Sequence, residues 1–126
     1  GNAVAAATAM AVLEVIQNEG LQANAQTVGS YFCDGLQDLA TRHHGIGDVR
    51  AAGLFLGVEM VTDRATMAPD AARTNHIVNA LRQARILISA TGPRANILKI
   101  RPPLVFSKAN VDLFIDRFDA VLKTQP

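Results

Sequence analysis

Two cationic residues near the end of the chain, Lys99 and Arg101, have the types and spacing that could bind a substrate. The segment 97–101 has the apolar, β-branched composition of a strand, and alternate residues of a strand project to the same side. An ammonium and a guanidinium on one face are able to hold a carboxylate or phosphate group. The alternative is that both side chains line a solvent-exposed strand face, and the residue pattern alone leaves both hypotheses open.

Other residue types that carry chemistry form no active-site pattern. The histidines lack a carboxylate at metal-ligand spacing, which favours solvent-exposed or helix-end positions for His43, His44 and His76. Cys33 is the only cysteine, so no disulfide or thiolate cluster forms within the chain. No phosphate-binding loop, nucleophile elbow or dinucleotide-binding glycine motif occurs, and the short Gly45–Gly47 motif is best interpreted as a turn. The residues themselves therefore predict neither a catalytic residue nor a metal site.

Three aspartates, Asp112, Asp116 and Asp119, follow one another at helical spacing near the end of the sequence. Such a group resembles a carboxylate cluster. However, the apolar residues of the same segment form a stripe on the other side of the predicted helix. We therefore expect these three carboxylates to lie on a solvated helix face.

The segments that must position Lys99 and Arg101 alternate between helical and extended patterns. Helices are predicted over 3–16, 21–43, 70–84 and from Ser107 onward, and strands over 48–52, 54–61, 86–89 and 97–101. This order, ααββαββα, predicts an α+β fold in which helices pack on one face of a three- to four-stranded antiparallel sheet. The last two strands would form a hairpin through the turn residues between them.

The first predicted helix has almost no polar side. Between residues 3 and 16 only Thr8 and Glu14 are polar. A surface helix of a small domain normally presents one solvated face, and large exposed apolar patches are rare on soluble monomers. We therefore expect another domain or subunit to cover part of this helix.

The composition places the chain among single globular domains. It has 126 residues and 13.4 kDa, with 49% hydrophobic and 18% charged residues, so one domain over 1–126 is expected. The net charge of +1 argues against an electrostatic nucleic-acid binder, and the composition argues against disorder. No apolar run is long enough for a membrane span and no leader precedes the first helix, so a cytoplasmic protein with no membrane or nucleic-acid partner is expected.

Three collinear segments carry a family resemblance. They are Gly1-Asn2-Ala3 with the Ala-rich helix that follows, residues 46–59, and residues 98–104. Together they resemble the C-terminal small domain of class III pyridoxal-phosphate-dependent aminotransferases, of fold type I, over essentially the whole chain. The sequence departs from the family pattern at Ala3, where proline is usual, and at Lys99, where arginine is common.

The departure at Lys99 bears on the substrate. In several relatives the arginine of this motif holds the carboxylate of the amino substrate, and a lysine cannot make the same bidentate pair. The segment 87–100 is similar to the branch that contains ethanolamine-phosphate and hydroxylysine-phosphate phospho-lyases, in which the cofactor drives elimination of phosphate. The resemblance thus implies contacts from Lys99 and Arg101 to an anionic amino substrate.

The resemblance also implies partners that this chain lacks. The cofactor, pyridoxal 5'-phosphate, would be bound by a large domain upstream, so no cofactor-binding residue is expected here and the chain alone is expected to be inactive. The full-length protein would be a homodimer acting on a small amino substrate. A class III aminotransferase is the first interpretation and a phospho-lyase acting on a phosphorylated amine the second. A stand-alone, non-catalytic α+β binding module, with the first helix as a homodimer interface, is the third.

Overall fold

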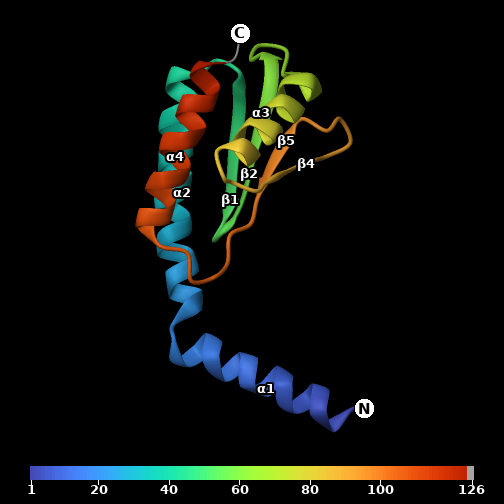
Figure 1. Cartoon of the computed structure of the whole chain (residues 1–126), viewed down its shortest axis with the longest axis vertical. Coiled ribbons are helices and arrows are strands. Elements are labelled where there is room, and N and C mark those ends of the chain that lie inside the picture. The colour runs from blue at the N-terminus through green and yellow to red at the C-terminus, as the bar shows by residue number, and fades with distance from the viewer. Residues whose placement is uncertain (125–126) are drawn as a thin grey trace.

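A computed structural model describes residues 1–124 of the chain (Figure 1). The helices are α1 (Ala3–Asn18), α2 (Leu21–Arg42), α3 (Ala71–Gln83) and α4 (Lys108–Lys123). The strands are β1 (Ile46–Ala52), β2 (Phe55–Asp63), β3 (Ala68–Pro69), β4 (Ser89–Thr91) and β5 (Ile97–Ile100). The predicted N-caps are present, since Asn2 and Ser107 accept hydrogen bonds from the first backbone amides of α1 and α4.

The sheet is antiparallel throughout, with the order β1-β2-β5-β4, and β3 pairs with the far end of β2. The predicted α+β fold with an antiparallel sheet is confirmed. The predicted order ααββαββα missed β3, so the order in the structure is ααβββαββα. This strand joins β2 through only two residue pairs, Val61 with Pro69 and Asp63 with Ala68. So short a strand shows no alternation of apolar and polar residues from which it could be predicted.

The predicted strand at 86–89 was misplaced, because β4 begins only at Ser89. Its ladder to β5 pairs Ser89 with Lys99 and Thr91 with Ile97. The preceding residues, Ile86 and Ile88, are half-buried against the core without joining that ladder. The apolar residues of this segment therefore indicated contact with the core and not the start of the strand, which depends on backbone pairing.

The core lies between one face of the sheet and α2, α3 and α4, which Figure 1 shows together on that side. Alternate strand residues point inward, including Leu56, Val58, Met60 and Leu98, each fully buried. They meet helix residues that share this burial, among them Phe32, Leu36, Ile77, Leu81 and Phe118. The expectation of helices on one face is confirmed for these three helices, and no helix of the described residues packs on the opposite face, which we call the open face.

Helix α1 does not join this core. None of its residues is buried, and Val4 and Met10 are 75% and 58% exposed. Gly20, with φ +62°, ends α1 and begins α2 in the left-handed region that favours glycine. Figure 1 shows α1 projecting away from the other elements. Within residues 1–124, no helix combines the length and apolar character needed to cross a membrane.

Candidate substrate-binding surface

On the open face of the sheet, residues of four neighbouring strands form one cross-strand row. Arg50 on β1 pairs with Gly57 on β2, Gly57 with Lys99 on β5, and Lys99 with Ser89 on β4. Their side chains project away from the buried positions that alternate with them. Helices α2, α3 and α4 occupy the other side, so this face of the chain is accessible to a ligand or to another domain.

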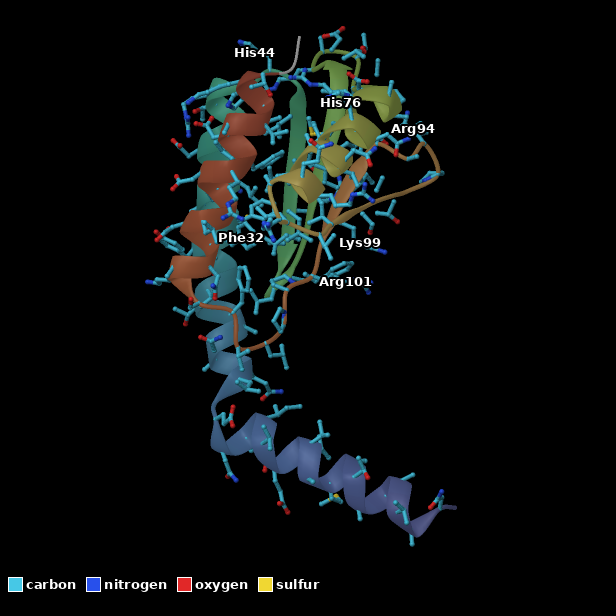
Figure 2. All side chains as sticks on the ribbon, viewed as in Figure 1. Phe32, His44, His76, Arg94, Lys99 and Arg101 are labelled. Atoms are coloured by element: carbon cyan, nitrogen blue, oxygen red, sulfur yellow. The ribbon has the colours of Figure 1, made fainter. Side chains whose placement is uncertain are left out.

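Lys99 and Arg101 line one hollow at the end of this row, together with Leu87, Ile88 and Ser89. Figure 2 shows the two labelled cations at the same end of β5. Lys99 is half-buried and Arg101 is exposed. Neither side chain forms an ion pair with another residue in the described range 1–124. The structure therefore places the two predicted residues side by side and leaves both charges available.

Lys99 also borders a second hollow of about 360 Å³ on the same face. Arg50 borders it from β1, and the apolar side chains Phe55 and Ile97 form its wall. Gly57 lies between the two cations in the cross-strand row, where the absence of a side chain leaves the space open. A ligand with one anionic group and a short apolar part would match these surroundings.

A polar network beside this hollow was not predicted from the sequence. Nη1 of Arg50 donates to Oδ2 of Asp48 at 2.6 Å and to Oε2 of Glu59 at 3.0 Å. Glu59 is only 9% exposed, and Nδ2 of Asn96 donates to its Oε1 at 3.4 Å. The hydrogen bond to Glu59 is the main cause that raises the pKa of Arg50. Strand alternation puts Arg50 on the same face as Asp48, but the contact with Glu59 also depends on how β1 and β2 align, for which the sequence gives no signal.

This network divides the cations of the open face into two groups. Arg50 is engaged by two carboxylates, and Nη2 of Arg94 lies 3.9 Å from Oε1 of Glu59. Lys99 and Arg101 have no such carboxylate within the described residues. A buried carboxylate is stabilised by the cations around it, and these cations have correspondingly less capacity for an external anion. The chemistry of the surface thus favours Lys99 and Arg101 as the contacts for an anionic ligand.

The aspartates of α4 do not all behave as the sequence predicted. Asp116 is exposed, as expected, but Asp112 accepts a hydrogen bond from the hydroxyl of Tyr31 at 2.7 Å. The side chain of Asp119 is 16% exposed and lies 2.6 Å from Nε2 of His43 and 2.7 Å from Nζ of Lys123. The expectation of a fully solvated face was wrong because α2 packs alongside α4 and brings partners to this side.

The histidines occupy the kind of position the sequence predicted. His43 follows the last residue of α2, while His44 and His76 are exposed, and Figure 2 labels both at the same end of the molecule. Within residues 1–124, no group of three histidine, cysteine or carboxylate side chains is placed to hold a metal ion. His43 thus contacts Asp119 of α4, whereas His44 and His76 face the solvent.

Comparison with known proteins identifies the family. The family model described as "Aminotransferase class-III" matches residues 1–122. The chain belongs to the class III aminotransferase family. It is 43% identical over 119 residues to alanine–glyoxylate aminotransferase 2 homolog 2, mitochondrial, of Arabidopsis thaliana, covering 94% of this chain and 25% of that protein. This class III chain thus spans about a quarter of the length of that curated relative.

Solved structures of similar proteins share the fold. A phospholyase from Arthrobacter in complex with phosphoethanolamine is 34% identical with a TM-score of 0.88, over 93% of this chain and 28% of that one. An amine transaminase from an uncultivated Pseudomonas species, solved in its PLP-bound form, is 30% identical with a TM-score of 0.82, over 91% and 26%. The solved structures that this chain resembles therefore include proteins described as a phospholyase and as an amine transaminase.

Proposed function

We propose that residues 1–126 are the C-terminal small domain of a pyridoxal-phosphate-dependent class III aminotransferase. In this role the chain closes one wall of the active site and presents Lys99 and Arg101 to an anionic amino substrate. The observation that carries the proposal is that both cations line one hollow on the open sheet face and lack carboxylate partners in the described residues. Family membership supplies the reaction class.

The cofactor would be held outside this chain. The main hollows of the described residues do not combine a lysine with an aspartate beside an aromatic ring, so they do not fit pyridoxal phosphate by themselves. A large domain of the same protein would therefore bind it, and the full-length protein would act as a homodimer. The cofactor would supply the chemistry, while this chain contributes substrate contacts and excludes water. The chain alone would then be inactive.

The substrate role is tested by single substitutions in the full-length parent protein. Lys99→Ala and Arg101→Ala are each expected to raise KM for an anionic amino donor about tenfold, since each removes one charge-assisted contact. The absorbance of the bound cofactor should not change. Arg82→Ala, on the exposed side of α3, is the matched control. Unchanged kinetics in both test variants would assign Lys99 and Arg101 to a solvated strand face instead.

A phospho-lyase acting on a phosphorylated amine is the second candidate. It is supported by the likeness to the Arthrobacter phospholyase and by the replacement of a bidentate arginine by Lys99, a compact cation suited to phosphate. Incubation of the full-length protein with phosphoethanolamine separates the two candidates. A lyase would consume water and release phosphate, ammonia and acetaldehyde without a keto acid, whereas an aminotransferase would form product only when a keto-acid acceptor is added.

The compartment of the parent protein stays a prediction. The sequence favours the cytoplasm, whereas the Arabidopsis relative is described as mitochondrial. Fractionation of cells that make the full-length protein decides between the two compartments.

A further inference from the structure

A second group of side chains lines a hollow of about 330 Å³ on the helix side of the sheet, between α2, α4 and the segments 85–88 and 100–106. Its apolar lining includes three phenylalanines, Phe32, Phe106 and Phe114. The ring centroid of Phe32 lies 6.1 Å from that of Phe106 and 5.0 Å from that of Phe114, so the rings form one continuous wall. This volume is within the range of small-molecule sites.

Three arginines, Arg85, Arg101 and Arg117, line the same hollow from three different segments. No residue of its lining carries a carboxylate. None of the three arginines forms an ion pair anywhere in the described chain, residues 1–124. Three guanidinium groups beside an apolar cavity raise the local positive potential, and this potential attracts an anion.

The position of Arg117 is fixed by the fold. Its Nη1 donates a hydrogen bond of 2.6 Å to the backbone oxygen of Ala84, at the end of α3. This contact joins α4 to the residue that precedes Arg85, and Arg85 and Arg117 line the same hollow. A guanidinium group held in place in this way binds an anion at a lower entropic cost than a mobile side chain.

We propose that this hollow binds a small amphipathic anion, a monocarboxylate with an aromatic or branched apolar body. The phenylalanine wall would contact the apolar body, and Arg85 and Arg117 would bind the carboxylate. Asn110, which also lines the hollow, would lie near the ligand. This hollow adjoins the one that holds the proposed substrate contacts, because Leu87, Ile88 and Arg101 border both. Arg85 and Arg117 line only the present hollow, so the proposal rests on them and does not depend on the proposed function.

The test is a fluorine NMR titration of para-fluorophenylpropanoate with the purified chain. Saturable binding with a dissociation constant below about 10 mM is expected, and the uncharged para-fluorophenylpropanamide should bind at least about threefold more weakly. Arg85→Gln should weaken binding of the carboxylate by about three- to tenfold. Residue 85 has a positive φ of +61°. Gln is chosen for this position because its side chain is similar in shape to that of Arg.

Two further variants complete the test. Arg82→Gln, on an exposed position one turn away, is the matched control and should bind the probe as the unchanged chain does. Arg117→Met removes the second cation and should weaken binding by a similar factor. Thermal unfolding of each variant checks that the fold is retained. Absence of saturation, equal affinity for the acid and the amide, or equal effects of the changes at positions 82 and 85 would overturn the proposal.

Discussion

Asp119 shows how one side chain connects two helices of this chain. Its carboxylate meets Nζ of Lys123, Nε2 of His43 and Nη1 of Arg42, the last at 3.2 Å. The hydrogen bond from Lys123 is the main cause that lowers the pKa of Asp119 well below its ordinary value, and His43 adds to it. The ionised carboxylate is therefore more stable in the folded chain than in the unfolded one, which ties α4 to the end of α2.

The stability of the chain should depend on pH through this group. Because the pKa of Asp119 is lower in the folded state, its contribution is complete above the unfolded value, near 3.8, and is lost as the pH falls below it. Asp119→Asn should lower the free energy of unfolding by about 1 kcal/mol at pH 7, since its main partner is exposed. Urea denaturation at several pH values measures this, and the difference should shrink in strong acid.

The control for that experiment is Asp116→Asn, because Asp116 is exposed on the same helix and forms no ion pair within residues 1–124. This variant should unfold like the unchanged chain across the pH range. An Asp119→Asn variant that is as stable as the Asp116→Asn variant at pH 7 would show that the contacts of Asp119 contribute nothing.

The candidate site was predictable from sequence only in part. Strand alternation predicted Lys99 and Arg101 on one side, and although β5 ends at Ile100, before Arg101, the structure finds both lining one hollow. The partners of Arg50 were not predictable in the same way, because its contact with Glu59 depends on how β1 and β2 align. A shift of one residue in that alignment would move every side chain of the strand to the other face.

At the scale of elements, helix α2 approaches the β1–β2 turn more closely than an ordinary side chain allows. A Cβ atom on Gly29 would lie 2.1 Å from the backbone oxygen of Gly53. Gly53 itself has φ +56°, so the turn is in a conformation that favours glycine. The packing of α2 on the sheet therefore depends on the glycine at position 29.

Gly29→Ala should accordingly destabilise the chain by about 2 kcal/mol, the order of an overpacked core. Gly35→Ala is the matched control in the same helix, because a Cβ there would meet only the side chain of Ile115 at 3.2 Å. Alanine favours helix over glycine by up to about 1 kcal/mol, so this control should be neutral or slightly stabilising. Equal losses in urea denaturation of the two variants would contradict the close approach.

The elements themselves were largely predictable, because helices with caps and apolar stripes leave strong patterns. Asn2 and Ser107 mark helix starts in the sequence and cap α1 and α4 in the structure. The errors fell on short strands such as β3 and β4, whose limits depend on backbone pairs with a distant partner. The local amino-acid composition does not indicate these backbone pairs.

In the molecule as a whole, the described fold does not explain why the apolar residues of α1 are exposed. Its apolar residues Val12, Leu13 and Val15 are 53%, 52% and 48% exposed. Burial of apolar area is the main force that stabilises association, and exposed patches of this kind mark interfaces. In the proposed function this helix packs against the large domain of the parent protein.

The substitution Leu13→Glu distinguishes the role of α1 in the stability of this chain from its role in that association. Since Leu13 makes no buried contact here, its replacement should change the free energy of unfolding of the chain by no more than about 0.5 kcal/mol. The same change in the full-length protein should lower its melting temperature and weaken retention of the cofactor. A full-length variant as stable as the unchanged protein would show that α1 is not part of that interface.

Native mass spectrometry decides whether this chain is one part of a larger pyridoxal-phosphate enzyme. The material is purified without denaturation from the cells that make it, and the mass and cofactor content of the assembly are measured. We predict that the 13.4 kDa chain is found with, or continuous with, a larger polypeptide that carries pyridoxal phosphate. A lone chain, or a dimer of two such chains without cofactor, would show that the chain is not part of such an enzyme and would favour a stand-alone binding module.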